Sequence, residues 1–120
     1  MPDQQARQFL LEFKEAVGAG HGIDLIPRKP TLLTLQFLGL TKRNLEEIVL
    51  SLSVLDYCSG PEPDRDRGGE VWVFGADVGD HEVYIKLKLA ESSGAKIPKC
   101  LSFHISKQPL KYPYRPTQDN

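Results

Sequence analysis

Cysteine and long apolar runs are both scarce in this chain. Its 120 residues include two cysteines, Cys58 and Cys100, whose spacing fits neither a metal site nor a disulfide framework. No apolar run approaches the roughly 20 residues that a membrane-spanning helix needs. The opening residues mix acidic with apolar side chains and contain no signal-peptide core. We therefore expect two free thiols, no membrane association and a cytoplasmic location.

The chain also lacks the short motifs of several enzyme classes. It contains no glycine-rich phosphate loop, no HExxH sequence and no CxxC pair. Its three histidines, His21, His81 and His104, are not spaced as metal ligands. Cys58 with His104 would make a nucleophile and a base, but no nucleophile-elbow motif accompanies them. The expectation is a protein that uses neither a metal ion nor a cofactor.

What is present is the composition of one ordinary globular domain, residues 1–120. Hydrophobic residues make up 40% and charged residues 26% of the chain, which excludes a disordered protein. The net charge of -1 conceals an asymmetry, because residues 1–80 hold 8 Lys and Arg against 13 Asp and Glu, whereas residues 81–120 hold 7 against 3. A basic C-terminal part suits an anionic ligand such as RNA, although chance also explains so small a split.

Apolar residues recur at helical spacing through the first half of the chain. This period predicts a helix over residues 4–17, within an N-terminal helical extension at 1–22. A second helix is expected to open at Pro30 and to end at Gly39, and Thr41 is expected to cap a third.

Beyond the third helix the period changes from helical to alternating. Residues 55–69, which contain GPEPDRDRGG, predict a loop, and residues 107–120 predict an irregular basic tail. Strands are expected at 71–74, 82–89 and 97–106, with a short further one compatible with 23–26. Helices followed by such strands indicate an α+β fold, in which an antiparallel β-meander of at least three strands packs on helices from the N-terminal half.

Alternation along two of these strands predicts which side chains leave the core. Apolar residues, Leu101 among them, occupy every second position and are expected to face the helices. The residues expected on the opposite face are Tyr84, Lys86, Lys88, Cys100, Ser102 and His104. Surface lysines that protect a strand edge and an ordinary surface histidine would explain the same pattern without any function.

The positions of the turns predict how the three strands pair. A turn centred on Gly94 places Tyr84 opposite His104, and a turn centred on Val78 places Trp72 opposite Tyr84. The result is a row formed by Trp72, Tyr84 and His104 across three strands.

This row offers the groups that cleave RNA without a metal ion. The 2′-hydroxyl of RNA attacks the adjacent phosphate, and the protein removes a proton, supplies another and stabilises negative charge. Histidine exchanges protons near neutral pH, so His104 can act as acid or base, assisted by Tyr84 if Lys86 lowers the pKa of that tyrosine. Lys86, with Arg65 or Arg67, can neutralise the phosphate. These five residues are the candidate catalytic residues.

Four more residues are candidate RNA contacts. Trp72 can stack on an unpaired base, and Lys88, Ser102 and Lys107 can contact the RNA backbone. The DRDR loop has a second interpretation, in which its aspartates and arginines form local ion pairs that order the connection.

Over residues 23–107 the chain resembles the motility quorum-sensing regulator (MqsR) type of toxin from bacterial toxin–antitoxin systems. The matching pieces are LGL at 38–40, the following IVLSLSVLDY, Trp72, the strand EVYIKLKL and the closing LSFH. The resemblance implies a RelE-like fold and sequence-preferring, metal-independent cleavage of messenger RNA. It also implies inhibition by a cognate antitoxin, expected to be a helix-turn-helix protein from the adjacent gene.

The family's site residues are matched in part. Its strand tyrosine falls on Tyr84, and a family lysine falls on His104, which also transfers protons. Another family lysine falls near Ser59 and a glutamine falls on Val73, so neither is matched, and we interpret a loop arginine as the replacement cation. The alternative function is a non-catalytic module that binds a partner, which these two departures and the pI of about 6.3 favour.

Overall fold

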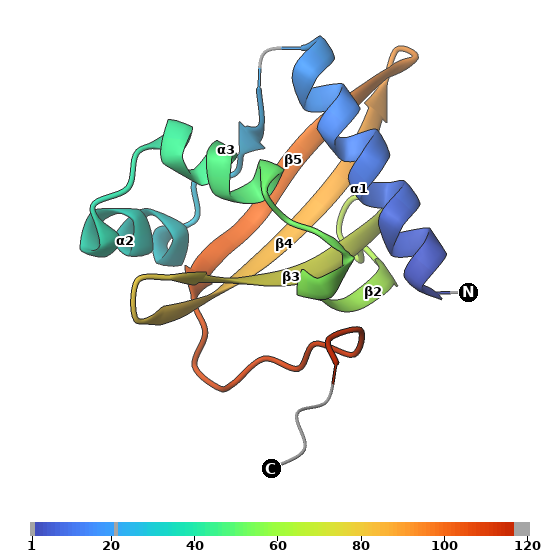
Figure 1. Ribbon diagram of the computed structural model, residues 1–120. Helices are drawn as coiled ribbons and strands as arrows, with labels where there is room; N and C mark the ends of the chain where they lie inside the picture. Colours follow the sequence, from blue (N-terminus) through green and yellow to red (C-terminus); the bar gives the residue numbers. More distant parts are fainter. Residues whose placement is uncertain (1, 21, 117–120) are drawn as a thin grey trace.

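Helices cover one face of a five-stranded sheet in the computed structural model, which describes residues 2–20 and 22–116 (Figure 1). Within this range the helices are α1 (Pro2–Ala19), α2 (Lys29–Leu38), α3 (Lys42–Leu50) and the 3-10 turn η1 (Val54–Asp56). The strands are β1 (Asp24–Leu25), β2 (Tyr57–Pro63), β3 (Glu70–Val78), β4 (His81–Ser92) and β5 (Ala95–Ile105). The predicted α+β class is confirmed. Met1 and His21 of the predicted extension and residues 117–120 of the predicted tail lie outside the described residues.

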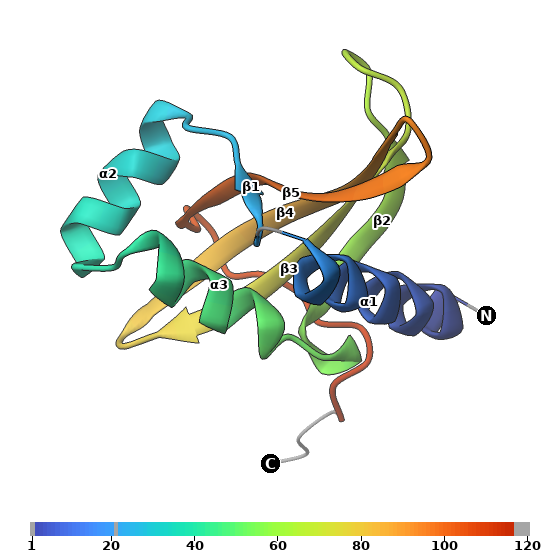
Figure 2. The same ribbon diagram turned by 90° about the horizontal axis from the view of Figure 1, so that it is seen from above.

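The sheet has the strand order β1-β5-β4-β3-β2. Strands β2 to β5 form an antiparallel meander, whereas the two-residue β1 pairs parallel with β5 at the sheet edge. Figure 1 and Figure 2 show α1 and α3 over one face of the sheet and α2 beside its β5 edge. We call the opposite side, which no helix covers, the outer face.

The core lies between the helices and the inner face of the sheet. Phe9 and Phe13 of α1 are buried there, as the helical period predicts. The ring of Phe9 stacks on Trp72 with centroids 5.0 Å apart, and it lies 6.1 Å from the ring of Phe74. Aromatic packing of this kind attaches α1 to β3.

The ends of α2 and α3 follow the predicted signals. Gly39 ends α2 in the left-handed conformation, with φ 69, where glycine has no Cβ to clash. Thr41 caps α3, because its hydroxyl accepts the backbone N–H of Asn44 while the Asn44 side chain accepts the N–H of Thr41. Both helix boundaries are therefore set locally.

The predicted loop at 55–69 is wrong for most of its length. Residues 57–63 form β2, which pairs with β3, and only residues 64–69 connect the two strands. Prolines at 61 and 63 fit this position because an edge strand has one side without ladder hydrogen bonds. Pairing with β3, the next strand along the chain, thus overrides the turn-like composition.

The predicted register between β3 and β4 is also wrong. The turn consists of Gly79 and Asp80, so Val78 pairs with His81, Gly75 lies opposite Tyr84 and Trp72 lies opposite Leu87. Gly79 has φ 61, a conformation that glycine adopts without strain. The row predicted from Trp72 to His104 therefore does not form, because Trp72 lies on the inner face.

The pairing of Tyr84 with His104 is confirmed, although the turn is not where it was expected. Ser93 and Gly94 form the turn and Ser92 pairs with Ala95, half a residue from the predicted centre. A bulge at Leu101 then adds one residue to β5 and restores the expected pairing beyond it.

The bulge reverses the predicted sides of two neighbouring residues. Cys100 pairs with Leu87 and is fully buried in the core, whereas Leu101 is buried but has no partner on β4 and lies outside the core cluster. The prediction of an outward Cys100 and an inward Leu101 is therefore wrong, since simple alternation does not anticipate the extra residue.

The tail is irregular as predicted, but its described part packs on the domain. Leu110 and Tyr112 lie against Gly75 on the outer face, where a Cβ atom would come within 2.7 Å of the Leu110 side chain. Glu82 accepts hydrogen bonds from the Leu110 N–H at 2.8 Å and from the Tyr112 hydroxyl at 2.7 Å. In Figure 1 the tail runs past β3 toward η1.

None of the helices in the described part of the chain has the length and apolar character needed to cross a membrane.

Candidate functional site

Tyr84 and His104 form a stacked pair on the outer face. They lie opposite each other on β4 and β5, with ring centroids 5.0 Å apart and ring planes at 18°. Alternation places both side chains outward, because Val83, Ile85 and Phe103 beside them are buried in the core. The strands themselves therefore hold the two rings together.

A backbone hydrogen bond orients the His104 ring. Its Nδ1 atom lies 3.1 Å from the carbonyl oxygen of Ile105. A carbonyl only accepts, so Nδ1 carries the proton in this contact, and a neutral ring then presents an unprotonated Nε2. The arrangement suits a general base.

The environment of Tyr84 favours the protonated phenol. Burial is the main cause that raises the pKa of Tyr84, and the negative charge of Glu62 raises it further. The expectation that Lys86 lowers this pKa is therefore wrong, since desolvation of a phenolate outweighs a lysine on the same strand. Tyr84 can thus donate a proton at neutral pH.

Lys86 lies in a row that crosses four strands. Ser59 of β2 pairs with Val73, Val73 pairs with Lys86, and Lys86 pairs with Ser102. Lys86 is half-buried and takes part in no ion pair among the described residues. Ser102 lies on the outer face as predicted, but it is only 7% exposed, which leaves little of it for direct contact with RNA.

The prediction of Lys88 as a free phosphate contact is wrong. Its ammonium group donates to Asp64 Oδ2 at 2.6 Å and to the Gly68 carbonyl at 2.6 Å, and the residue is 6% exposed. Asp64 Oδ1 also accepts the backbone N–H groups of Asp66 and Arg67. Lys88 and Asp64 therefore close the loop at 64–69.

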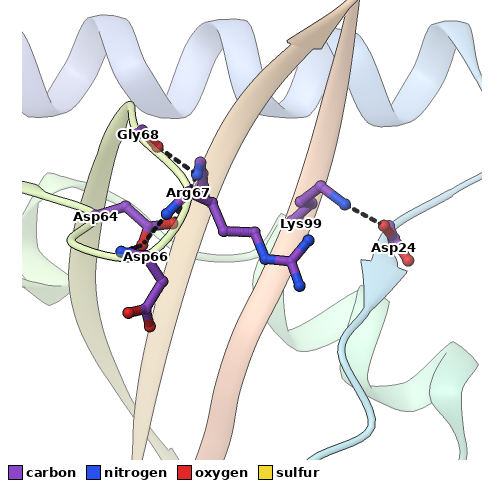
Figure 3. Close-up of polar contacts among 7 residues, drawn as sticks. Asp24, Asp64, Asp66, Arg67, Gly68 and Lys99 are labelled. Atoms are coloured by element: carbon purple, nitrogen blue, oxygen red, sulfur yellow. Dashed lines mark hydrogen bonds and ion pairs between the residues drawn. The ribbon is translucent and has the colours of Figure 1, made fainter.

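The two loop arginines differ in position. Figure 3 shows the Arg67 side chain extending across the strands on the Lys99 side of the loop. Arg67 lines a cleft with Lys88 and Lys99, whereas Arg65 is exposed and does not line that cleft. The loop thus brings Arg67, and not Arg65, over the sheet.

The prediction of Trp72 as a base-stacking residue is wrong. Its side chain is 6% exposed and lies between Phe9 and Tyr57 in the core. Lys107 is exposed where the tail begins, just beyond β5. It remains a candidate contact for an anionic ligand.

Several neighbours of the stacked pair were not predicted. Glu62 and Cys58 lie near Tyr84, and the negative charge of Glu62 contributes to its raised pKa. Tyr112 also lies near Cys58; it belongs to the described part of the tail, residues 107–116, which we call the strap. Burial, assisted by the charge of Glu82, raises the pKa of Cys58 to about 11, so this thiol stays protonated and is a poor nucleophile. The positions of Cys58 and Glu62 depend on the pairing of β2 with β3. The turn-like sequence of this segment does not predict that it is a strand.

Lys99 also was not predicted, although a signal existed. Alternation that places Leu101 inward places Lys99 inward as well, and a buried unpaired lysine is costly. That conflict points to the bulge in β5 that turns Lys99 outward.

Among residues 2–20 and 22–116 no three His, Cys, Asp or Glu side chains gather as metal ligands. Comparison of the chain with models of protein families, with curated proteins and with solved structures finds no match.

Proposed function

We propose that this protein is a toxin endoribonuclease that cleaves messenger RNA by attack of the RNA 2′-hydroxyl, without a metal ion. The observation that carries the proposal is the stacked pair of Tyr84 and His104 beside Lys86 on the outer face. A core does not require these three polar groups on a surface free of helices, whereas strand-scission of RNA uses a base, an acid and a cation together.

The proposed roles follow from the protonation of each group. His104 Nε2 takes the proton of the 2′-hydroxyl, and the 2′-oxygen attacks phosphorus. The bond from phosphorus to the 5′-oxygen breaks, and Tyr84 gives that oxygen its proton. The products are a 2′,3′-cyclic phosphate and a 5′-hydroxyl, and solvent returns the proton from His104 to Tyr84.

Lys86 is the proposed cation at the scissile phosphate. It shares its cross-strand row with Ser59 and Val73, the positions where MqsR-type toxins carry a lysine and a glutamine. A lysine in the same cross-strand row, two strands from Ser59, can supply the charge that Ser59 lacks, which replaces our expectation that a loop arginine does so. The RelE-like fold, the cytoplasmic location and a helix-turn-helix antitoxin from the adjacent gene belong to the same proposal.

Incubation of the pure protein with a defined messenger RNA in EDTA tests the activity. His104→Ala and Tyr84→Phe should each reduce the cleavage rate by about 10²–10⁴-fold, the usual contribution of a general acid or base. His81→Ala is the matched control, because His81 contacts Phe37 at the far end of β4 and should leave the rate unchanged. Cleavage that needs a divalent metal, or that persists in both variants, rejects the proposal.

A partner-binding module without catalysis is the second candidate. Phe37 is 68% exposed and Leu33 is 53% exposed on α2, which gives this helix an uncovered apolar side. Growth of cells after induction separates the two functions. Arrest that the adjacent gene relieves supports the toxin, and unimpaired growth with folded protein present supports the module.

A further inference from the structure

A second cationic site lies at the other end of the outer face. A cleft of about 430 Å³ opens between the loop at 64–69, β5 and the segment that leads into α2. Its basic lining residues are Arg28, Arg67, Lys88 and Lys99. These residues come from four separate segments of the chain, so only the folded protein brings them together.

The acidic residues around the cleft neutralise only part of this charge. Asp64 holds the ammonium group of Lys88 at 2.6 Å, and Asp24 holds that of Lys99 at 2.6 Å. Asp66 is the remaining acidic residue of the lining. Four cations face three carboxylates, which leaves the cleft positive.

Two of the cations are available to a ligand. Within the described parts of the chain, the side chains of Arg28 and Arg67 form no ion pair or hydrogen bond. Figure 3 shows the Arg67 side chain extending across the strands on the Lys99 side of the loop, while the Lys99 ammonium group is turned to Asp24; Arg67 and Lys99 line the same cleft. Like charges repel in a shared cleft unless an anion lies between them.

The helix that follows Arg28 adds to the positive potential. Arg28 is the N-cap of α2, which has no side-chain cap and no acidic residue in its first turn. Helices usually carry acidic residues at this end, because the helix dipole is positive there. A cation at this position is unfavourable for the helix alone and favours binding of an anion.

Two apolar residues also line the cleft. Leu101, turned outward by the bulge, and Ile26 line it together with the cations. A nucleotide matches such a surface, because it has an anionic phosphate together with the largely apolar flat face of its base.

The cleft is separate from the stacked pair. Lys88 pairs with Lys99, four residues along β4 from the pair of Tyr84 with His104. At about 3.3 Å per residue the two sites are roughly 13 Å apart. Arg67 lines this cleft, whose lining includes neither Tyr84 nor His104, and one short RNA strand can reach both sites.

We propose that this cleft holds a phosphate of the RNA strand that flanks the scissile bond, with Arg67 and Arg28 as its contacts. The proposal rests on the proposed function for the identity of the strand. Arg67 is then a residue for binding and positioning, and Tyr84 and His104 perform the chemistry. Arginine suits the role because its fixed fork of N–H groups contacts phosphate with two hydrogen bonds.

Binding of a fluorescent RNA oligonucleotide whose 2′-hydroxyls are methylated tests the cleft without cleavage. We expect Arg67→Gln and Arg28→Gln each to weaken affinity roughly tenfold or more in fluorescence anisotropy. Each should also reduce the slope of log affinity against log salt by about 1. Arg65→Gln is the matched control, since Arg65 belongs to the same loop but does not line the cleft.

Cleavage of unmodified RNA separates this inference from the proposed function. Arg67→Gln should raise KM and leave kcat within twofold of the wild-type value, whereas His104→Ala lowers kcat and keeps the affinity for the methylated oligonucleotide. If both glutamine variants bind as tightly as wild-type protein, the cleft is rejected while wild-type cleavage still supports the nuclease. If no protein cleaves RNA but both variants lose binding, the nuclease is rejected and the anion site stands.

Discussion

At the scale of single residues, Tyr84 and His104 have complementary protonation preferences. Burial and Glu62 hold the pKa of Tyr84 above its ordinary value, so the phenol keeps its proton. The Ile105 carbonyl oxygen lies 3.1 Å from His104 Nδ1, and the neutral tautomer that donates this hydrogen bond has an unprotonated Nε2. The two rings therefore differ in the role that each can take in the proposed cleavage.

The raised pKa of Tyr84 predicts the alkaline side of the pH–rate profile. A general acid must be protonated, so cleavage should persist up to the ordinary tyrosine value of about 10 and decline only above it. Tyr84→Phe should remove this decline along with most of the rate. The rate of His104→Ala protein in the same buffers gives the background hydrolysis of RNA by hydroxide. A decline that begins below pH 9 and depends on Tyr84 would contradict the assignment.

Gly75 is the residue at which the tail approaches the sheet most closely. A Cβ atom there would meet the Leu110 side chain and the Tyr112 hydroxyl. Gly75→Ala should therefore displace the strap, lower the free energy of unfolding by about 1–3 kcal/mol and speed tryptic cleavage after Lys107 and Lys111. Gly18→Ala is the control, because nothing lies near its added methyl group. Equal proteolysis rates for Gly75→Ala and wild type would show that the strap does not lie on Gly75.

At the scale of elements, α2 completes the edge of the sheet. The two-residue β1 covers β5 only at Lys99 and Cys100. Further along, the backbone N–H groups of Phe103 and Ile105 donate instead to the hydroxyls of Thr31 and Thr34, at 3.1 and 3.3 Å. Buried N–H groups need such partners, which explains two buried threonines on an otherwise leucine-rich helix.

Removal of one of these hydroxyls should leave a buried donor unsatisfied. Thr31→Val keeps the shape of the side chain and should lower the free energy of unfolding by about 1–3 kcal/mol in urea denaturation. Thr31→Ser keeps the hydroxyl and should preserve the protection of the Phe103 amide from hydrogen exchange, which Thr31→Val should lose. Unchanged protection in the valine variant would contradict the role of the hydroxyl.

The loop at 64–69 depends on one carboxylate. The Lys88 ammonium lowers the pKa of Asp64, and the backbone N–H groups of Asp66 and Arg67 lower it further. The unfolded chain therefore takes up this proton at a higher pH than the folded chain, so the stabilisation is complete above about pH 4. It is lost as the pH falls through the lowered pKa of the folded state.

Hydrogen exchange of the loop amides measures this dependence. Protection of the Asp66 and Arg67 amides should decrease below pH 4 in wild-type protein, once the rates are corrected for intrinsic exchange. Asp64→Asn should lack this protection already at neutral pH. Asp66→Asn is the control, because no side-chain hydrogen bond of Asp66 closes the loop in the described structure.

At the scale of the whole molecule, the tail joins the outer face to η1. Tyr114 stacks on Tyr57 with centroids 5.2 Å apart. Arg115 donates to the Leu55 carbonyl and to Asp56, both at 2.9 Å. Since Cys58 lies among these groups, the strap forms one wall of the surface that carries Tyr84.

Removal of the tail from residue 109 onward should uncover Cys58. Its reaction with a disulfide reagent should accelerate, because burial is the main cause that keeps this thiol protonated. Cys100 provides an internal control, since it is fully buried in the core cluster and this burial raises its pKa to about 12. If the thiol titration is identical with and without the tail, the strap does not shield Cys58.

The candidate site was predictable where it depended on one strand or one hairpin. Alternation alone places Tyr84 and Lys86 outward. The predicted pairing of Tyr84 with His104 is correct because the bulge at Leu101 offsets the error in the position of the turn. Trp72 was assigned to the wrong face because the β3–β4 turn lies at Gly79 and Asp80. Arg28 and Lys99 were missed because their neighbours in space are far apart in the chain.

The sequence by itself determined the helices, their caps and the polar pattern of β4, because periodicity and capping act over a few residues. The tertiary structure decided that β2 is a strand, that Trp72 is buried, that the bulge turns Lys99 outward and that Arg67, not Arg65, reaches over the sheet. Each of these depends on register or packing between distant segments, and one additional residue in a strand reverses every side chain beyond it. The cleft beside the stacked pair is therefore a property of the folded chain.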